Sequence, residues 1–239
     1  MSPTRVRAIF RKELREYRRN RQIVVTMAVL PLVFIISPVI QIFVLPATSV
    51  VSLAGKQPLI YMLAIPAIVP STVAAYSVAG ERQQGALEPV LTTPILAREF
   101  LLGKALAALM PVLAVSFGVF GVFVAAIELF AKAPIAAAVL QGPEVIGQLI
   151  FTPLVAALSI WAGIAISSRS SDPRVATQLS VLASLPSIAM AVVVSTGLIH
   201  ATLVFSIVFG AILLWIDVIG WRLVAPMFDR ERLITGTRA

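Results

Sequence analysis

The last third of the chain constrains the fold most, because it is almost uninterruptedly apolar from Val175 to Trp221. As a single α-helix these 47 residues would be about 70 Å long, whereas the hydrocarbon core of a bilayer is about 30 Å thick. The run must therefore fold back once, and its one plausible corner lies at residues 195–200. We expect two membrane spans here, at about 175–194 and 201–221.

The rest of the chain has the same character. Of its 239 residues 59% are hydrophobic and 13% are charged, whereas an ordinary soluble domain is about 45–50% apolar and about 25% charged. An all-α membrane protein with six transmembrane helices between residues 23 and 221 is therefore predicted. The other four spans are expected at about 23–45, 58–79, 104–127 and 145–166.

Residues 1–22 predict a further helix of a different kind. Apolar side chains recur there at steps of three and four, with basic residues between them, as in Val6, Phe10, Leu14 and Tyr17. This pattern is typical of an amphipathic helix in the membrane interface, with its basic face on anionic lipid headgroups. The alternative is a solvated basic tail.

The basic residues also predict an orientation. Of the 19 Lys and Arg residues, 17 fall on one side of a six-span topology, which under the positive-inside rule is the cytoplasmic side. Both termini, including a tail at 222–239, and the connection at 81–104 are then cytoplasmic. Arg outnumbers Lys 15 to 4, which favours a GC-rich bacterial source and hence the inner membrane.

Several functions find no support in the residues. Cysteine is absent, His200 is the single histidine, and the phosphate-binding loop of ATPases and the common hydrolase motifs are missing, so no catalytic or metal-ligating residue is predicted. The positive charge is concentrated on one side of the expected membrane topology, so it does not indicate binding to nucleic acid. Asp217 is the ionisable residue that stands out within a span, and either a structural polar contact or a role in a transport pathway or gate would explain it.

The connection after the second span carries an unexpected pattern. Leu87, Val90, Leu91 and Ile95 recur at helical spacing within a polar, cytoplasmic loop. A short amphipathic helix of this kind requires a surface to dock on, which is either the bilayer or a cytosolic protein.

This segment resembles the ABC type-2 (ABC-2) transporter permease family. The matching residues are Glu81, Gly85-Ala86-Leu87-Glu88, Leu91, Thr93-Pro94-Ile95 and Gly103-Lys104, together with Arg11-Lys12-Glu13-Leu14 and Pro31 near the start. Two residues depart from the family pattern: Ala86 stands where Thr is usual, and Pro89 follows the glutamate.

The resemblance implies a half-transporter that pairs with a second permease subunit, identical or different, in membrane lipid. Separate ATPase subunits would bind ATP and Mg²⁺, so this chain would be no enzyme and would hold no cofactor itself. A coupling helix between spans two and three would enter the ATPase, through Glu81, Gly85, Leu87, Glu88, Leu91, Thr93 and Pro94. The N-terminal interface helix, with Arg11, Lys12, Glu13 and Arg15, would touch the same subunit.

The resemblance further implies export, and the apolar spans suit a hydrophobic or amphiphilic substrate such as a drug or lipid. Two other functions remain open at this point. One is a stand-alone secondary transporter driven by an ion gradient, and the other is a membrane-embedded assembly factor that transports nothing.

Overall fold

The computed structural model describes residues 2–44, 58–83, 96–170, 172–196, 198 and 202–228. Within these ranges the chain forms helices and no strand. The elements are α1 (Pro3–Arg19), α2 (Arg21–Val39) with the π-helix η1 (Ile40–Val44), the 3₁₀-helix η3 (Pro58–Leu63), α4 (Ala64–Gln83), α6 (Ala97–Phe130), α7 (Ala133–Val139), α8 (Gly142–Arg169), α9 (Pro173–Ser195), α10 (Leu203–Val224) and the 3₁₀-helix η4 (Ala225–Phe228).

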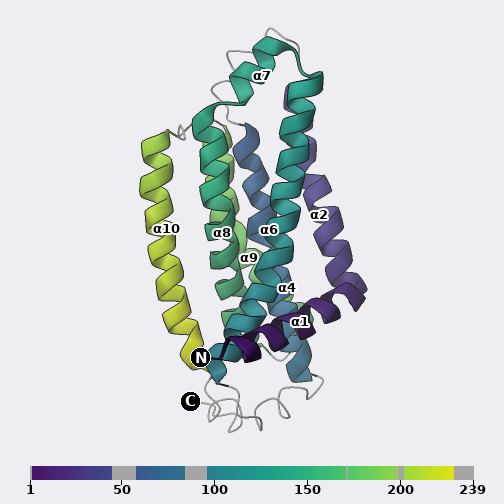
Figure 1. Ribbon diagram of the computed structural model, residues 1–239, viewed down its shortest axis with the longest axis vertical. Coiled ribbons are helices and arrows are strands. Elements are labelled where there is room, and N and C mark those ends of the chain that lie inside the picture. Colours follow the sequence, from purple (N-terminus) through teal and green to yellow (C-terminus); the bar gives the residue numbers. More distant parts are fainter. Residues whose placement is uncertain are drawn as a thin grey trace.

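Six of these helical segments are long and apolar enough to cross a membrane, which confirms the predicted fold class. They run along the long axis of the molecule, while α1 lies across one end and α7 lies at the other (Figure 1). We call these the α1 end and the α7 end. The first residues form helix α1, as their apolar spacing predicted. The contact of this helix with lipid headgroups stays a prediction.

Helix α4 is the centre of the bundle, packed against α2, α6, α8 and α9. Small residues let the helices approach, as is usual where no hydrophobic effect drives helices together in lipid. At Gly163 of α8, a Cβ atom would lie only 2.5 Å from the carbonyl oxygen of Ser71 in α4. Ser167 donates a hydrogen bond to the Ala75 carbonyl at 2.6 Å, and Ser184 of α9 donates to the Ser71 hydroxyl at 3.0 Å.

Helix α10 packs against α8 and runs in the same direction. Ser206 lies opposite Gly147, and Gly220 lies opposite Trp161, so paired residues differ by 59 in number at both places. Helices α9 and α10 follow directly on the capping residues Asp172 and Thr202, each of which accepts a hydrogen bond from a backbone N–H of the first helical turn.

Several observed helices extend beyond the spans expected from the sequence. Helix α4 ends at Gln83, so Glu81, which the sequence placed in the connection, lies in its last turn and is buried. Helix α6 begins at Ala97, so Lys104 lies in its second turn, where the sequence suggested the start of a span. Helix α8 begins at Gly142, so Glu144, which the sequence placed in a connection, lies in its first turn and is fully buried.

Candidate functional site

Four charged residues join three helices at the α1 end, and we call them the basal cluster: Lys12 and Glu13 of α1, Glu81 of α4 and Lys104 of α6. Lys104 is only 1% exposed, and its Nζ lies 2.9 Å from Glu13 Oε1 and 2.8 Å from Glu81 Oε2. Lys12 Nζ lies 2.6 Å from Glu81 Oε1. The two lysines balance the two carboxylates in charge, and Glu13, Glu81 and Lys104 are buried whereas Lys12 is exposed, so α1 is held on the bundle by a largely buried set of ion pairs.

The surroundings of Lys12 favour its charged form. Burial alone would lower the pKa of Lys12, but its hydrogen bond and attraction to Glu81, with help from Glu13 and Glu16, raise that pKa above the ordinary lysine value. Burial raises the pKa of Glu13, and the attraction of Lys104 opposes that shift.

A third carboxylate completes the surroundings of Lys12. Oxygens of Glu13, Glu16 and Glu81 come within 4.8 Å of one another, a spacing that could hold a metal ion. Lys12 Nζ is close to this group, 3.3 Å from Glu16 and 2.6 Å from Glu81. The lysine therefore supplies the positive charge that a bound cation would bring.

A second contact fixes α1 to the beginning of α6. The Ser2 backbone N–H donates to Glu99 Oε1, and Arg5 Nη1 lies 3.5 Å from Glu99 Oε2. The Leu96 backbone N–H also donates to Glu99 Oε2, at 3.2 Å, so this buried carboxylate caps the first turn of α6 as well. Glu99 therefore connects the start of α6 with the start of α1.

Between these two contacts α1 crosses α6 at Gly103. A Cβ atom there would lie 2.6 Å from Ile9 Cγ2 and 3.3 Å from the Val6 carbonyl oxygen. Glycine permits this approach, and the next residue, Lys104, forms the buried ion pairs. The Gly103-Lys104 pair thus has a structural explanation as the place where α1 docks.

The structure brings together three of the residues predicted as functional, Lys12, Glu13 and Glu81, while Arg11 and Arg15 are exposed on α1. The other predicted coupling residues lie outside the described residues and their roles stay predictions: Gly85, Leu87, Glu88, Leu91, Thr93 and Pro94.

Sequence reasoning did not place Lys104 or Glu99 in the candidate site. Two signals were available for Lys104: the Gly103-Lys104 pair of the family pattern, and a charge at the start of an apolar run. Its carboxylate partners lie on other helices, and Glu13 precedes Lys104 by 91 positions in the chain.

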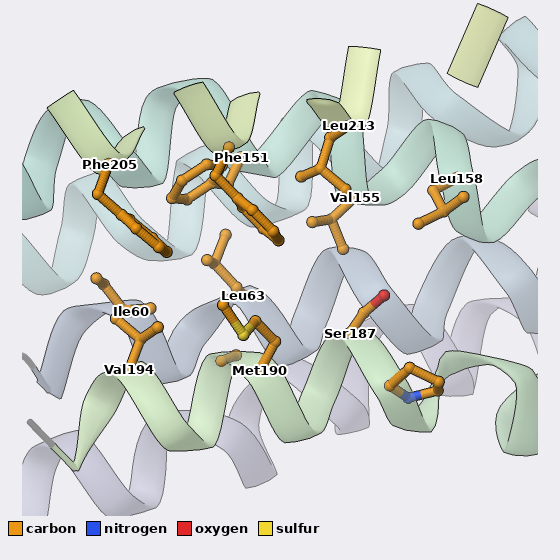
Figure 2. Close-up of a pocket in the computed structure, with 13 residues that line it drawn as sticks. Ile60, Leu63, Phe151, Val155, Leu158, Ser187, Met190, Val194, Phe205 and Leu213 are labelled. Atoms are coloured by element: carbon orange, nitrogen blue, oxygen red, sulfur yellow. The ribbon is translucent and has the colours of Figure 1, made fainter. Parts of the chain in front are cut away.

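A pocket of about 200 Å³ lies within the membrane-spanning part of the molecule. Figure 2 shows side chains of α8 and α10 facing those of η3 and α9 across it. Three phenylalanines form part of its wall, with Phe205 stacked on Phe209 at a centroid distance of 5.4 Å and Phe151 edge-on to Phe209 at 5.7 Å. The Ser187 hydroxyl is the polar side-chain group of an otherwise apolar lining.

Asp217 lies beyond the end of this pocket and is not one of its lining residues. Leu213, which lines the pocket, precedes Asp217 by one turn of α10, and the offset between α8 and α10 puts Asp217 at the level of Leu158, another lining residue. Asp217 is 8% exposed, and among the described residues neither of its oxygens has a hydrogen-bond partner. Asp217 is therefore a buried carboxyl group. Arg222 of the same helix is exposed and forms no ion pair with Asp217 in the described part of the chain.

These features define a multi-pass membrane protein whose first helix is docked on the base of its spans. The chain matches the model of the ABC-2 family transporter protein over residues 7–208 and belongs to that family. It is therefore the permease subunit of an ABC transporter, a class that in general assembles as a dimer with ATPase partners. No curated protein shows a significant sequence match to the chain.

Proposed function

We propose that this permease forms half of an export pathway in the bacterial inner membrane, with both termini in the cytoplasm, and that a separate ATPase drives it through the segment 84–95. The proposed cargo is hydrophobic or amphiphilic. ATP and Mg²⁺ would bind the ATPase, and α1, with its exposed Arg11 and Arg15, would lie against the same subunit.

One observation carries the proposal: both flanks of the segment 84–95 are fastened to α1. On one flank Glu81 is bound by Lys12 and Lys104, and on the other Glu99 is bound by Ser2 and Arg5. A force applied to the segment therefore reaches α1, α4 and α6 together, and α4 lies at the centre of the bundle. This is the mechanical arrangement that a transporter needs if a motor on another chain is to move its spans.

The first experiment is the purification of the tagged full-length chain from its own host. An ATPase subunit that copurifies and hydrolyses ATP supports the proposal. A chain that purifies without an ATPase, and transports in response to an ion gradient alone, would instead support the stand-alone transporter. A chain that does neither would support the assembly factor.

Glu88→Lys is expected to weaken the complex with the ATPase and to lower the ATPase activity stimulated by the permease. Reversing a charge at an interface creates like-charge contacts that cost several kcal/mol, so we expect at least about a tenfold loss of affinity. Copurification and ATPase rate measure the effect, and membrane insertion is checked by fractionation.

Glu128→Lys is the matched control, because Glu128 is an exposed carboxylate near the far end of α6, toward α7. It should leave both the complex and the ATPase rate unchanged. A Glu88→Lys variant with normal coupling would remove this residue from the ATPase contact.

A further inference from the structure

The pocket beside Asp217 has the two parts of a site for an amphiphile. Its lining is apolar apart from Ser187, and the buried carboxyl group of Asp217 lies beyond this lining, one turn of α10 past Leu213 on the side of α1. Pockets for drug-sized ligands are roughly 300–1,000 Å³, so a cavity of about 200 Å³ suits one slender apolar chain better than a bulky ring system.

The carboxyl group of Asp217 lacks the partner that such a group requires. A buried charge in a membrane protein is costly and is normally paired with another charged or polar group. In the described residues, Asp217 has neither a hydrogen bond nor an ion pair, and its helix packs chiefly against α8, where Leu154 faces Gly210 and Trp161 faces Gly220 on either side of it. A cation that entered from outside the chain would supply this missing partner.

We propose that this site binds an amphipathic organic cation, with its alkyl chain in the pocket and its ammonium group against Asp217. The inference rests on the proposed function and names the substrate class of the exporter. With the α1 end in the cytoplasm, the head of the bound cation points toward the cytoplasm and its tail toward the middle of the bilayer. This is the orientation that such a molecule has in the cytoplasmic leaflet before export.

The test measures direct binding to the full-length permease in lipid nanodiscs, with empty nanodiscs as background. The probes are radiolabelled decyltrimethylammonium and decyl sulfonate, which share a tail and carry opposite charges. The wild type is expected to bind the cation at least about tenfold more tightly than the anion, which corresponds to about 1.4 kcal/mol.

Three variants locate the site. Asp217→Asn keeps the shape and removes the charge, so it should abolish the preference for the cation, whereas Asp217→Glu should retain it. Ala191→Phe adds a ring to the pocket lining and should weaken binding of both probes. Glu128→Gln removes an exposed carboxylate on α6 and should change nothing. Each variant is first checked for a single gel-filtration peak and a wild-type melting temperature.

Several results would overturn the inference. Equal binding of the two probes would mean simple partition into an apolar surface, and binding of neither would mean that a second copy or another segment fills the pocket. Loss of the preference in Glu144→Gln and not in Asp217→Asn would assign the head to the buried carboxyl at the α7 end. The binding assay contains no ATPase, so it tests this inference separately from the proposed function. If the cation does not bind but ATPase coupling is normal, the inference is wrong and the proposed function stands. If the cation binds but no ATPase partner is found, the inference stands and the proposed function is wrong.

Discussion

Lys104→Met is expected to destabilise the protein by about 3–5 kcal/mol, the usual cost of removing one partner from a buried ion pair. The methionine fills the same space, but Glu13 and Glu81 then share a single remaining lysine, Lys12. Two buried carboxylates with one counter-charge repel each other across the α1–α4 contact. We therefore expect α1 to leave the bundle before the spans themselves unfold.

Two measurements follow these events. Thermal unfolding in nanodiscs reports the overall loss of stability, and limited trypsin digestion reports the release of α1, whose exposed arginines then become easier to cleave. The double variant Glu13→Gln/Lys104→Met leaves one lysine facing one carboxylate and should recover most of the lost stability. Lys132→Met removes an exposed lysine before α7 and should have no effect. A Lys104→Met protein as stable as the wild type would show that the basal cluster does not hold α1.

Gly163→Ala is the second change for which we expect a large effect. The new Cβ would lie 2.5 Å from the Ser71 carbonyl oxygen and 3.2 Å from its Cα, and both contacts are with backbone atoms that cannot rotate away. Helices α4 and α8 must move apart, which weakens the hydrogen bond between Ser167 and Ala75. We expect a loss of about 1–3 kcal/mol, as for other overpacked interiors.

The same substitution at Gly118 and Gly121 of α6 supplies the control. No heavy atom lies within 4 Å of a Cβ at either position, so alanine meets no obstacle there. Because alanine favours the helix by roughly 0.5–1 kcal/mol over glycine, these variants should be as stable as the wild type or slightly more so. Unfolding by heat and by denaturant separates the two cases. Equal stability of Gly163→Ala and Gly118→Ala would contradict the close approach of α4 to α8.

The fold class was accessible from the sequence because it depends on local properties. A single apolar helix over residues 175–221 would be longer than a bilayer is thick, which predicted two spans there. The structure has α9 and α10 at these positions. The family was accessible as well, because the residues at 81–95 form a short continuous pattern, and the match over 7–208 confirms it.

The candidate sites were accessible only in part, because they depend on contacts between distant residues. Lys12 and Glu81 are separated by 69 residues, and hydropathy does not indicate that they meet. Glu144 follows Pro143 in a polar stretch, which suggested a connection, whereas tertiary packing buries it completely. Asp217 was singled out by its charge, but the pocket beside it combines four elements and could not be seen in any one of them.

The distance along the chain between α1 and its partners also sets an order for biosynthesis. Glu81 follows Lys12 by 69 residues and Lys104 follows Glu13 by 91, which at about 5–20 residues per second is a delay of roughly 3–18 seconds. During that interval the ribosome has released α1 but not the helices on which it docks. The amphipathic pattern of α1 predicts that the helix stays at the membrane surface during this interval, until α6 has been inserted.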